Sequence, residues 1–198
     1  MRNDFWNERY AIENYAYGTA PNRFFKSELD KTPIGKILFP AEGEGRNAVY
    51  AARKGFDVYA FDPSLEGRKK AIMLAETNAV TIDYQLVTYE EAQYAENSFD
   101  VLVLIFCHMP PSKREAYHRK LISFLKPGGK LILEGFSKEQ IHNQTGGPSD
   151  VDMLFSVDVL RSDFSSLSEI SVSKENAMLE EGLFHKGKAS VIRVVGVK

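Results

Sequence analysis

Short apolar runs alternate with longer segments of helical period along most of the chain. Ser64 can cap a helix reaching about Asn78, and Ser112 can cap another whose apolar residues recur on one face. Such alternation predicts an α/β fold of the Rossmann-like kind, with a parallel sheet covered by helices on both faces. The predicted strands cover residues 37–40, 58–62, 84–87, 101–106 and 130–136.

The last third of the chain breaks this alternation. After a predicted helix at 156–164, two β-rich segments cover about 167–179 and 189–198, joined by residues 180–188. This connection has no room for a crossover helix, so we expect the two segments to pair as an antiparallel hairpin at the sheet edge. A nicotinamide-binding dehydrogenase does not usually end in this way.

Residues 36–62 carry the strongest chemical signal. They read as strand, glycine turn, helix of small residues, strand and acid. Gly43 and Gly45 allow a tight turn and the close approach of a ligand, and Asp62 follows about 20 residues later, where a carboxylate can accept both ribose hydroxyls. The alternative is an ordinary βαβ turn whose acid caps the next helix. The combination favours a site for an adenosine-containing cofactor.

Composition narrows the class of protein. The 198 residues, 43% hydrophobic and 26% charged, fit a single domain over 1–198. A formal charge of −2 gives no basic footprint for nucleic acid or an anionic membrane. The apolar run 101–109 is too short to span a membrane, and the polar N-terminus is unlike a secretory signal, so we expect a cytosolic protein. One cysteine, Cys107, and four scattered histidines predict neither a disulfide nor a metal site.

With the glycine turn, Asp62, the segment 125–131 (LKPGGKL) and the terminal hairpin, the chain resembles class I S-adenosylmethionine-dependent methyltransferases over roughly residues 5–198. Residues 42–49 and 17–22 look like the tellurite-resistance and thiopurine methyltransferase branch. The resemblance implies a three-layer sandwich with a seven-stranded sheet of order 3-2-1-4-5-7-6, the last strand antiparallel. It also implies S-adenosyl-L-methionine as cofactor and a small-molecule acceptor.

The resemblance also implies roles for individual residues. The turn 41–45 would lie under the methionine and ribose, with Asn47 opening the next helix. Asp62 would bind the ribose hydroxyls, while Tyr89 could stack on the adenine and Glu90 accept from its amine. The implied cofactor-binding set is Tyr17, Ala41, Glu42, Gly43, Gly45, Asn47, Asp62, Pro63, Ser64, Tyr89, Glu90 and Phe106.

The chain departs from the family pattern at one place. The family usually has an acid at the end of the first strand and a glycine two residues later, where this chain has Phe39 and Ala41. The usual anchor for the cofactor's amino group is therefore absent, and Glu42 or Glu44 could replace it. This departure keeps open a non-catalytic sensor or partner subunit that binds the cofactor without turnover. A nicotinamide-dependent oxidoreductase shares the turn and the acid, but the turn has no third glycine at the usual spacing.

Methyl transfer requires a base only where the acceptor must lose a proton. His108, after the fourth predicted strand, is the candidate, and the alternative is that it hydrogen-bonds loop backbone before Pro110. Residues 1–30 could form a helical lid whose aromatic side chains cover the cofactor, or could pack on the sheet. The polar loop 137–150, which contains Gln140 and His142, could form an acceptor wall.

Overall fold

Seven strands within residues 3–198, the part of the chain that the computed structural model describes, form a sheet of order β3-β2-β1-β4-β5-β7-β6. The strands are β1 Lys36–Pro40, β2 Asp57–Phe61, β3 Asp83–Gln85, β4 Phe99–Ile105, β5 Leu125–Phe136, β6 Glu169–Glu181 and β7 His185–Val197. The helices are α1 Asn3–Tyr10, α2 Arg23–Leu29, α3 Arg46–Arg53, α4 Leu65–Thr77, α5 Pro111–Phe124, η1 Lys138–His142, η2 Val151–Met153 and α6 Val157–Asp163. The predicted strand order and the antiparallel ending are confirmed.

Two predicted boundaries are wrong for local reasons. Helix α5 begins at Pro111 with Pro110 as its N-cap, so Ser112 is not the cap. A proline loses nothing at the first helical position, where its missing N–H would have no helical partner. The same helix ends at Phe124, because Lys126 precedes Pro127 and is disfavoured in the helical region. Strand β5 therefore starts at Leu125, five residues before the predicted strand.

The hairpin turn is also shorter than its sequence suggests. Strand β6 continues to Glu181 and β7 starts at His185, which leaves a turn of Gly182, Leu183 and Phe184. Gly182 has a φ of 66°, a value that glycine adopts readily. The chain divides into two compact units, and residues 181–184 belong to the first of them.

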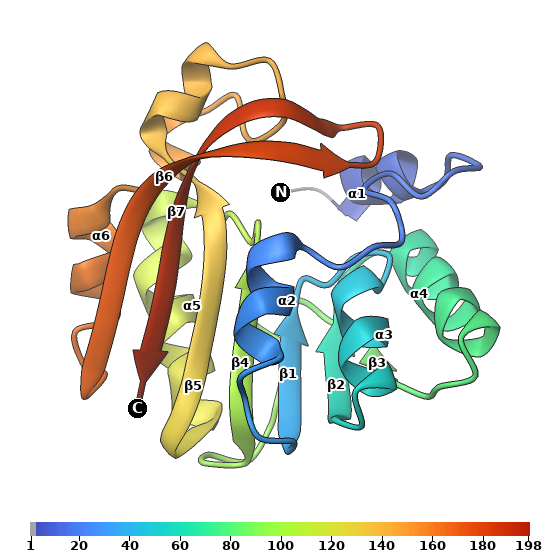
Figure 1. The fold of residues 1–198 in the computed structure, drawn as a ribbon, viewed down its shortest axis with the longest axis horizontal. Coiled ribbons are helices and arrows are strands. Elements are labelled where there is room, and N and C mark those ends of the chain that lie inside the picture. The colour runs from blue at the N-terminus through green and yellow to red at the C-terminus, as the bar shows by residue number, and fades with distance from the viewer. Residues whose placement is uncertain (1–2) are drawn as a thin grey trace. The chain divides into compact units, whose positions relative to one another are not determined.

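The first unit comprises residues 3–93 and Glu181–Phe184. Its strands β1, β2 and β3 pair in parallel. Figure 1 shows α2 and α3 on the same face of β1 and β2, and α4 beside α3. Val49, Leu74 and Ala75 pack between α3 and α4, with Tyr15 against them. Helix α1 lies on α4, so the N-terminal segment is part of this unit.

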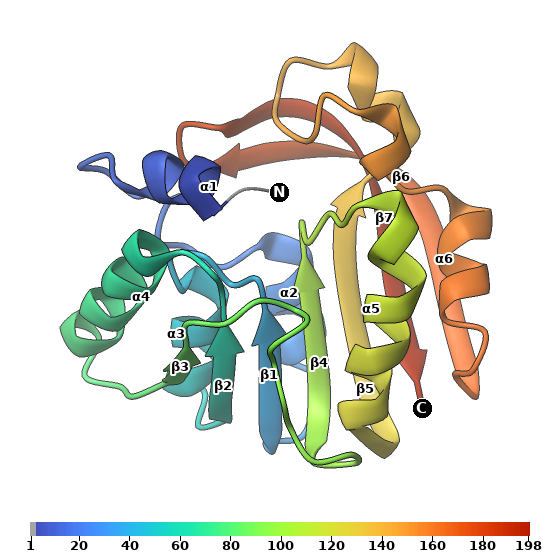
Figure 2. The same cartoon turned by 180° about the vertical axis from the view of Figure 1, so that it is seen from behind.

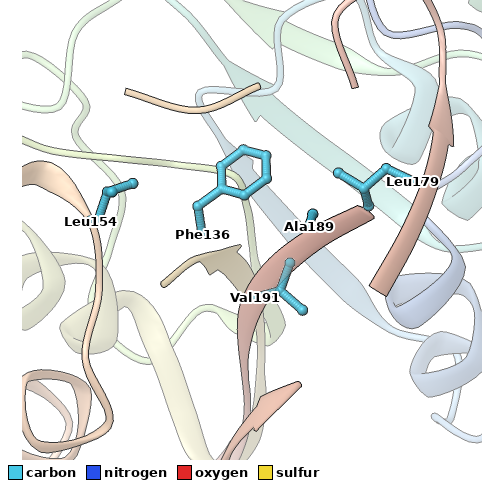
Figure 3. Close-up of a cluster of buried hydrophobic side chains, with 5 residues drawn as sticks. All are labelled: Phe136, Leu154, Leu179, Ala189 and Val191. Atoms are coloured by element: carbon cyan, nitrogen blue, oxygen red, sulfur yellow. The ribbon is translucent and has the colours of Figure 1, made fainter. Parts of the chain in front are cut away.

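The second unit comprises residues 94–180 and 185–198. Strand β4 pairs in parallel with β5, which pairs antiparallel with β7. Figure 2 shows α5 in front of β4 and β5, with α6 next to it. A further apolar cluster, drawn in Figure 3, joins Phe136 at the end of β5 to residues of β6, β7 and the segment after η2. Its members are Phe136, Leu154, Leu179, Ala189 and Val191.

A buried polar group ties the two helices of this unit together. The Nδ1 of His118 on α5 lies 2.8 Å from the Asp163 carboxylate on α6, and Arg114 donates to the same carboxylate at 2.7 Å. Burial lowers the pKa of His118, and the hydrogen bond to Asp163 opposes this effect only in part.

Two further observations concern the described residues as a whole. No helix among them is both long and apolar enough to cross a membrane. Within residues 3–198, no group of His, Cys, Asp and Glu side chains is arranged to hold a metal ion.

Candidate cofactor-binding site

The turn after β1 requires its glycines. Gly43 and Gly45 have φ values of 64° and 85°, and Gly45 is the N-cap of α3. A Cβ on Gly45 would lie 2.7 Å from the Cβ of Ala71 on α4. Ala41 also has a positive φ, 50°, although it is not glycine. Backbone strain of this kind is concentrated at functional sites in proteins.

Asp62 lies where the sequence places it, directly after β2. Its side chain is buried, Oδ2 accepts from the N–H of Gly43 at 3.2 Å, and Oδ1 accepts from the N–H of Ser64 at 2.8 Å. Burial raises the pKa of Asp62 to about 6, and the two N–H donors offset only part of this effect. Each oxygen can accept a second hydrogen bond, which is what two ribose hydroxyls require.

Glu42 accepts hydrogen bonds from the first turn of α3, the helix that follows the glycine turn. Its Oε1 accepts from the N–H groups of Asn47 and Ala48 at 2.9 and 2.8 Å, which places the carboxylate at the positive end of the α3 dipole. Burial nevertheless raises the pKa of Glu42 to about 7. A carboxylate with so high a pKa lacks full compensation by a cation.

Glu44, the other acid of the turn, is compensated. Its Oε1 forms an ion pair with Lys70 at 3.0 Å, and its Oε2 accepts from the N–H of Ala16 at 2.8 Å. Lys70 also donates to the carbonyls of Ile12 and Asn14. Glu44 therefore holds the N-terminal segment, and Glu42 is the better placed of the two acids to bind a cofactor's amino group.

Two tyrosines outside the predicted cofactor-binding set contact Gly43. The hydroxyl of Tyr84 on β3 donates to the Gly43 carbonyl at 2.6 Å. The Tyr10 hydroxyl lies so close that a Cβ on Gly43 would be 2.5 Å from it. Burial and the nearby Asp62 carboxylate raise the pKa of Tyr10 well above its usual value. Tyr10 belongs to the aromatic N-terminal segment, which was the only sequence signal for this contact.

Ser64 and Pro63 begin the segment expected beside the adenine. The Ser64 hydroxyl accepts from the N–H of Gly67, which makes Ser64 the N-cap of α4 as predicted, and it donates to the Asn7 amide oxygen at 2.8 Å. Asn7 thereby joins α1 to the first turn of α4. Pro63 is partly exposed.

The residues after β3 occupy a turn. The Tyr89 ring contacts the Phe61 ring edge-on, with centroids 5.7 Å apart, and is half-buried. Glu90 is exposed. Glu91 closes the turn by accepting from the N–H and the hydroxyl of Thr88. Because Phe61 is buried and its ring is nearly perpendicular to that of Tyr89, Tyr89 is the only one of the two rings with exposed surface to offer a purine.

Tyr17 and Asn47 connect the turn to the N-terminal segment. The Asn47 Oδ1 accepts from the N–H of Asn22 at 2.9 Å, so its side chain holds the chain before α2. The Tyr17 hydroxyl accepts from Arg9 at 3.4 Å, and its ring lies 6.2 Å from that of Phe184. We call residues 41–47 and 62–64 the cofactor edge.

Phe106 directly follows β4 in the second unit. Its φ is 54°, unusual for a bulky residue, and its N–H donates to the Glu134 carbonyl at 2.7 Å. Its ring packs against those of Phe136 and His185, at 4.5 and 4.6 Å between centroids. The strained backbone directs this strand end into an aromatic cluster.

Both ring nitrogens of His108 contact backbone. Nδ1 lies 2.9 Å from the Met153 carbonyl, and Nε2 lies 3.1 Å from the N–H of Phe136. These partners require a neutral ring with the proton on Nδ1. Burial lowers the pKa of His108 to about 4. The geometry favours the structural alternative, because neither nitrogen is left to take a proton from an acceptor.

The loop after β5 is fixed by one buried amide. The Gln140 Oε1 accepts from the N–H of Ser190 at 2.8 Å, and its Nε2 donates to the Thr145 hydroxyl and the Gly146 carbonyl. Gln140 therefore orders the loop rather than facing an acceptor, and His142 is exposed.

Comparison with known proteins finds a similarity that covers part of this chain. Residues 37–129, which contain the glycine turn and Asp62, match the family model described as methyltransferase domain. The match and the fold support a class I S-adenosylmethionine-dependent methyltransferase. This family and fold imply S-adenosyl-L-methionine as the cofactor.

Curated relatives of the methyltransferase domain are distant. The chain is 27% identical over 135 residues to phosphoethanolamine N-methyltransferase 1 of Triticum aestivum, which covers 66% of this chain and 27% of the relative. It is 27% identical over 143 residues to the ubiquinone/menaquinone biosynthesis C-methyltransferase UbiE of Geotalea daltonii, which covers 69% and 59%. The chain thus spans about a quarter of the first relative and about three fifths of the second.

Solved structures share the fold at lower identity. TehB from Haemophilus influenzae superposes with a TM-score of 0.74 at 16% identity, covering 99% of this chain and 66% of TehB. A structure described under the conversion of a disulfide bond into a thioacetal group during echinomycin biosynthesis gives 0.75 at 16% identity, covering 99% and 92%. At this identity these structures show a shared fold and do not assign the tellurite-resistance branch.

The cofactor edge fits the cofactor. Asp62 offers two buried carboxylate oxygens to ribose hydroxyls, and Glu42 offers an incompletely compensated carboxylate to an ammonium group. Both acids carry a raised pKa, and a ligand with two positive groups and several donors would lower each of them.

Proposed function

We propose that this protein transfers a methyl group from S-adenosyl-L-methionine to a small-molecule acceptor. The observation that carries the proposal is the pair of acids at the glycine turn, the half-buried Glu42 and the buried Asp62, each with a pKa raised by burial. In this proposal the Glu42 carboxylate accepts from the amino group of the cofactor, and the Asp62 carboxylate accepts from the ribose hydroxyls. Glu44 is excluded from this role because Lys70 and Ala16 already bind it.

When bound, the cofactor supplies an activated methyl group on a positively charged sulfur. The tasks left to the protein are to bind it, align the acceptor and exclude water. Asp62 accepts from the ribose and Glu42 binds the amino group, while Tyr89 and Pro63 border the adenine. Of the predicted lid over residues 1–30, the described part from residue 3 onward covers the turn, because α1 brings Tyr10 against Gly43 and Asn7 against Ser64.

The acceptor is proposed to be small, and the reaction cytoplasmic. Curated relatives named for phosphoethanolamine and quinone methylation support a small acceptor, and the net charge of −2 disfavours nucleic acid. Because both nitrogens of His108 bind backbone, we favour acceptors that need no base at neutral pH. Thiolates and chalcogen oxyanions are such acceptors, and the latter agree with the tellurite-resistance branch.

Calorimetric titration of the cofactor-stripped protein tests the cofactor assignment. We expect binding of S-adenosylmethionine and S-adenosylhomocysteine, and none of NADH or NADPH. Binding of a nicotinamide nucleotide alone would contradict the proposal in favour of an oxidoreductase.

A methylation assay then distinguishes an enzyme from a sensor. Thiols, chalcogen oxyanions, amines and carboxylates are offered with labelled cofactor, and product formation with any of them supports the enzyme. Cofactor binding without transfer to any member of this panel would favour a non-catalytic sensor.

A further inference from the structure

Glu181, at the end of β6, is buried in an ion pair within the first unit. Its Oε2 lies 2.9 Å from Nη2 of Arg46, and the two side chains are only 9% and 8% exposed. Its Oε1 accepts from the Asn22 amide at 2.9 Å. A buried pair of this kind contributes little net stability relative to apolar residues of similar size. Fold stability alone therefore gives little reason for a charge here.

Both partners of Glu181 reach the cofactor edge. Arg46 follows Gly45 directly, and its Nη1 donates to the Tyr17 carbonyl at 3.4 Å. The backbone N–H of Asn22 donates to the side chain of Asn47, whose own N–H donates to Glu42. Glu181 thus connects, through one residue on each side, the segment 17–22 to the turn that bears Glu42.

The residues after Glu181 add a second attachment. Leu183 donates its N–H to the Ala16 carbonyl at 3.0 Å. A Cβ on Gly182 would lie 2.5 Å from the Ala16 carbonyl oxygen and from the Gly18 nitrogen. The backbones of segments 16–18 and 182–183 are therefore in direct contact, and only glycine fits between them.

The aromatic ring of this turn completes the contact. The Arg9 guanidinium lies 3.9 Å above the centroid of the Phe184 ring, and Arg9 also donates to the Tyr17 hydroxyl. A cation over an aromatic face at this distance is attracted by the ring's electrons. The turn 181–184 thus reaches α1 through Arg9 as well as the segment 16–22.

We infer that Glu181 is a positioning residue for cofactor binding. The turn 181–184 holds segment 9–22 over the cofactor edge, an inference that rests on the proposed function. The charge on Glu181 sets the direction of Arg46, and through it the placement of Tyr17. A carboxylate is required because it must receive a guanidinium and an amide at once, which an amide side chain cannot do with the same geometry.

The test compares Glu181→Gln with Glu180→Gln, an exposed acid next in sequence. We expect Glu181→Gln to weaken S-adenosylhomocysteine binding by about five- to tenfold at a temperature where both variants are fully folded, the effect of losing one charge-assisted contact. Glu180→Gln should bind like the unmodified protein. Binding by Glu181→Gln within twofold of the control would overturn the inference.

Hydrogen exchange separates this inference from the proposed function. In the ligand-free protein, Glu181→Gln should speed the exchange of the backbone amide hydrogens of residues 9–22. The exchange rates in β1 and β2 should be unchanged. If the unmodified protein binds neither cofactor form, the proposed function fails while this exchange result still tests the positioning role. Uniformly faster exchange across the first unit would mean that Glu181 only stabilises the fold.

A second variant tests the turn without altering the buried ion pair, in case Glu181→Gln does not fold. Phe184→Leu removes the ring beneath Arg9 but leaves the buried pair intact. We expect it to stay folded and to weaken S-adenosylhomocysteine binding by about two- to fivefold, the scale of one cation–π contact between half-buried side chains. Unchanged binding would contradict the role assigned to the turn.

Discussion

The backbone N–H of Gly43 donates to the Asp62 carboxylate across 19 residues of sequence, at 3.2 Å. The turn and the acid are therefore one structural unit, and the turn fixes the direction of the carboxylate. A second N–H, from Ser64, holds the other oxygen. The acid is thus oriented before any ligand arrives, which lowers the cost of binding.

Removing this acid should weaken cofactor binding. Asp62→Ala is expected to cost roughly 1 to 3 kcal/mol of binding free energy, the scale of hydrogen bonds to a charged group. Asp57→Ala is the matched control, because Asp57 begins the same strand and pairs with Lys36 in an exposed ion pair. Titration with S-adenosylhomocysteine measures the cofactor affinity of both variants. Equal affinity in the two variants would remove the ribose assignment.

Cofactor affinity should rise with pH near neutrality. Burial raises the pKa of Asp62 to about 6 and that of Glu42 to about 7, and the proposed contacts need both ionised. Between about pH 5.5 and 7.5 we expect affinity to increase by roughly 10- to 100-fold, with protons released on binding. Calorimetry in buffers of different ionisation enthalpy detects that release. A flat profile would mean that neither acid meets the cofactor.

The free energy of unfolding of the ligand-free protein should fall as pH rises, whereas cofactor affinity should increase. The folded pKa of Asp62 exceeds its unfolded value, so the folded state keeps a proton between about pH 4 and 6 that the unfolded state has lost. The free energy of unfolding therefore falls as pH rises through this window, by on the order of 3 kcal/mol from Asp62. Urea unfolding of the protein and of Asp62→Ala at several pH values isolates this contribution.

Local geometry explains which parts the sequence predicted. Gly43, Gly45 and Asp62 were found because turn, helix start and strand end lie within 20 residues and each has a residue-type signature. The sheet order followed from the alternation and from the hairpin. These features depend on backbone conformation, which nearby sequence largely determines.

Long-range partners explain what the sequence left open. The sequence does not separate Glu42 from Glu44, which differ in their long-range partners: Lys70, 26 residues beyond Glu44, and Ala16, 28 residues before it, both bind Glu44. The role of Glu181 depends on Arg46, 135 residues away. No local signal encodes such pairings. For the same reason, backbone hydrogen bonds of His108 were considered from the sequence, but Met153 and Phe136 were not identified as the partners.

A methyl group at Gly45 should disrupt the turn. In Gly45→Ala the new Cβ would clash with Ala71 on α4, and the φ of 85° is unfavourable for alanine. We expect the free energy of unfolding to fall by roughly 2 to 4 kcal/mol, the combined scale of strain and overpacking. Gly128→Ala is the control, since its φ is also positive but nothing lies within 4 Å of the new Cβ. The difference between the two variants in urea unfolding measures the clash alone.

His108 should remain neutral over the physiological range. With its pKa lowered to about 4 and both nitrogens bonded to backbone, it should show one tautomer, protonated at Nδ1. Nitrogen-15 NMR of the ring identifies the tautomer directly, and no change should occur from about pH 6 to 8. Titration of this ring near pH 6.5 would restore His108 as a candidate base.

The buried pair of Glu44 and Lys70 should control how the N-terminal segment is held. In Lys70→Met, the Glu44 carboxylate, at 3% side-chain exposure, is left with only backbone donors, and the carbonyls of Ile12 and Asn14 lose a donor. We expect a loss of roughly 2 to 4 kcal/mol in the free energy of unfolding, near the range for a broken buried pair. Lys69→Met is the control, because Lys69 pairs with Glu66 at the surface and should change stability little.

Adding Glu44→Gln to Lys70→Met tests the origin of that loss. The second change replaces the buried carboxylate that has lost its cation, so the double variant should recover part of the stability lost in Lys70→Met. Urea unfolding of the two single variants and the double variant gives the coupling energy of the pair. Strictly additive losses would show that Lys70 acts through the carbonyls of the N-terminal segment and not through Glu44.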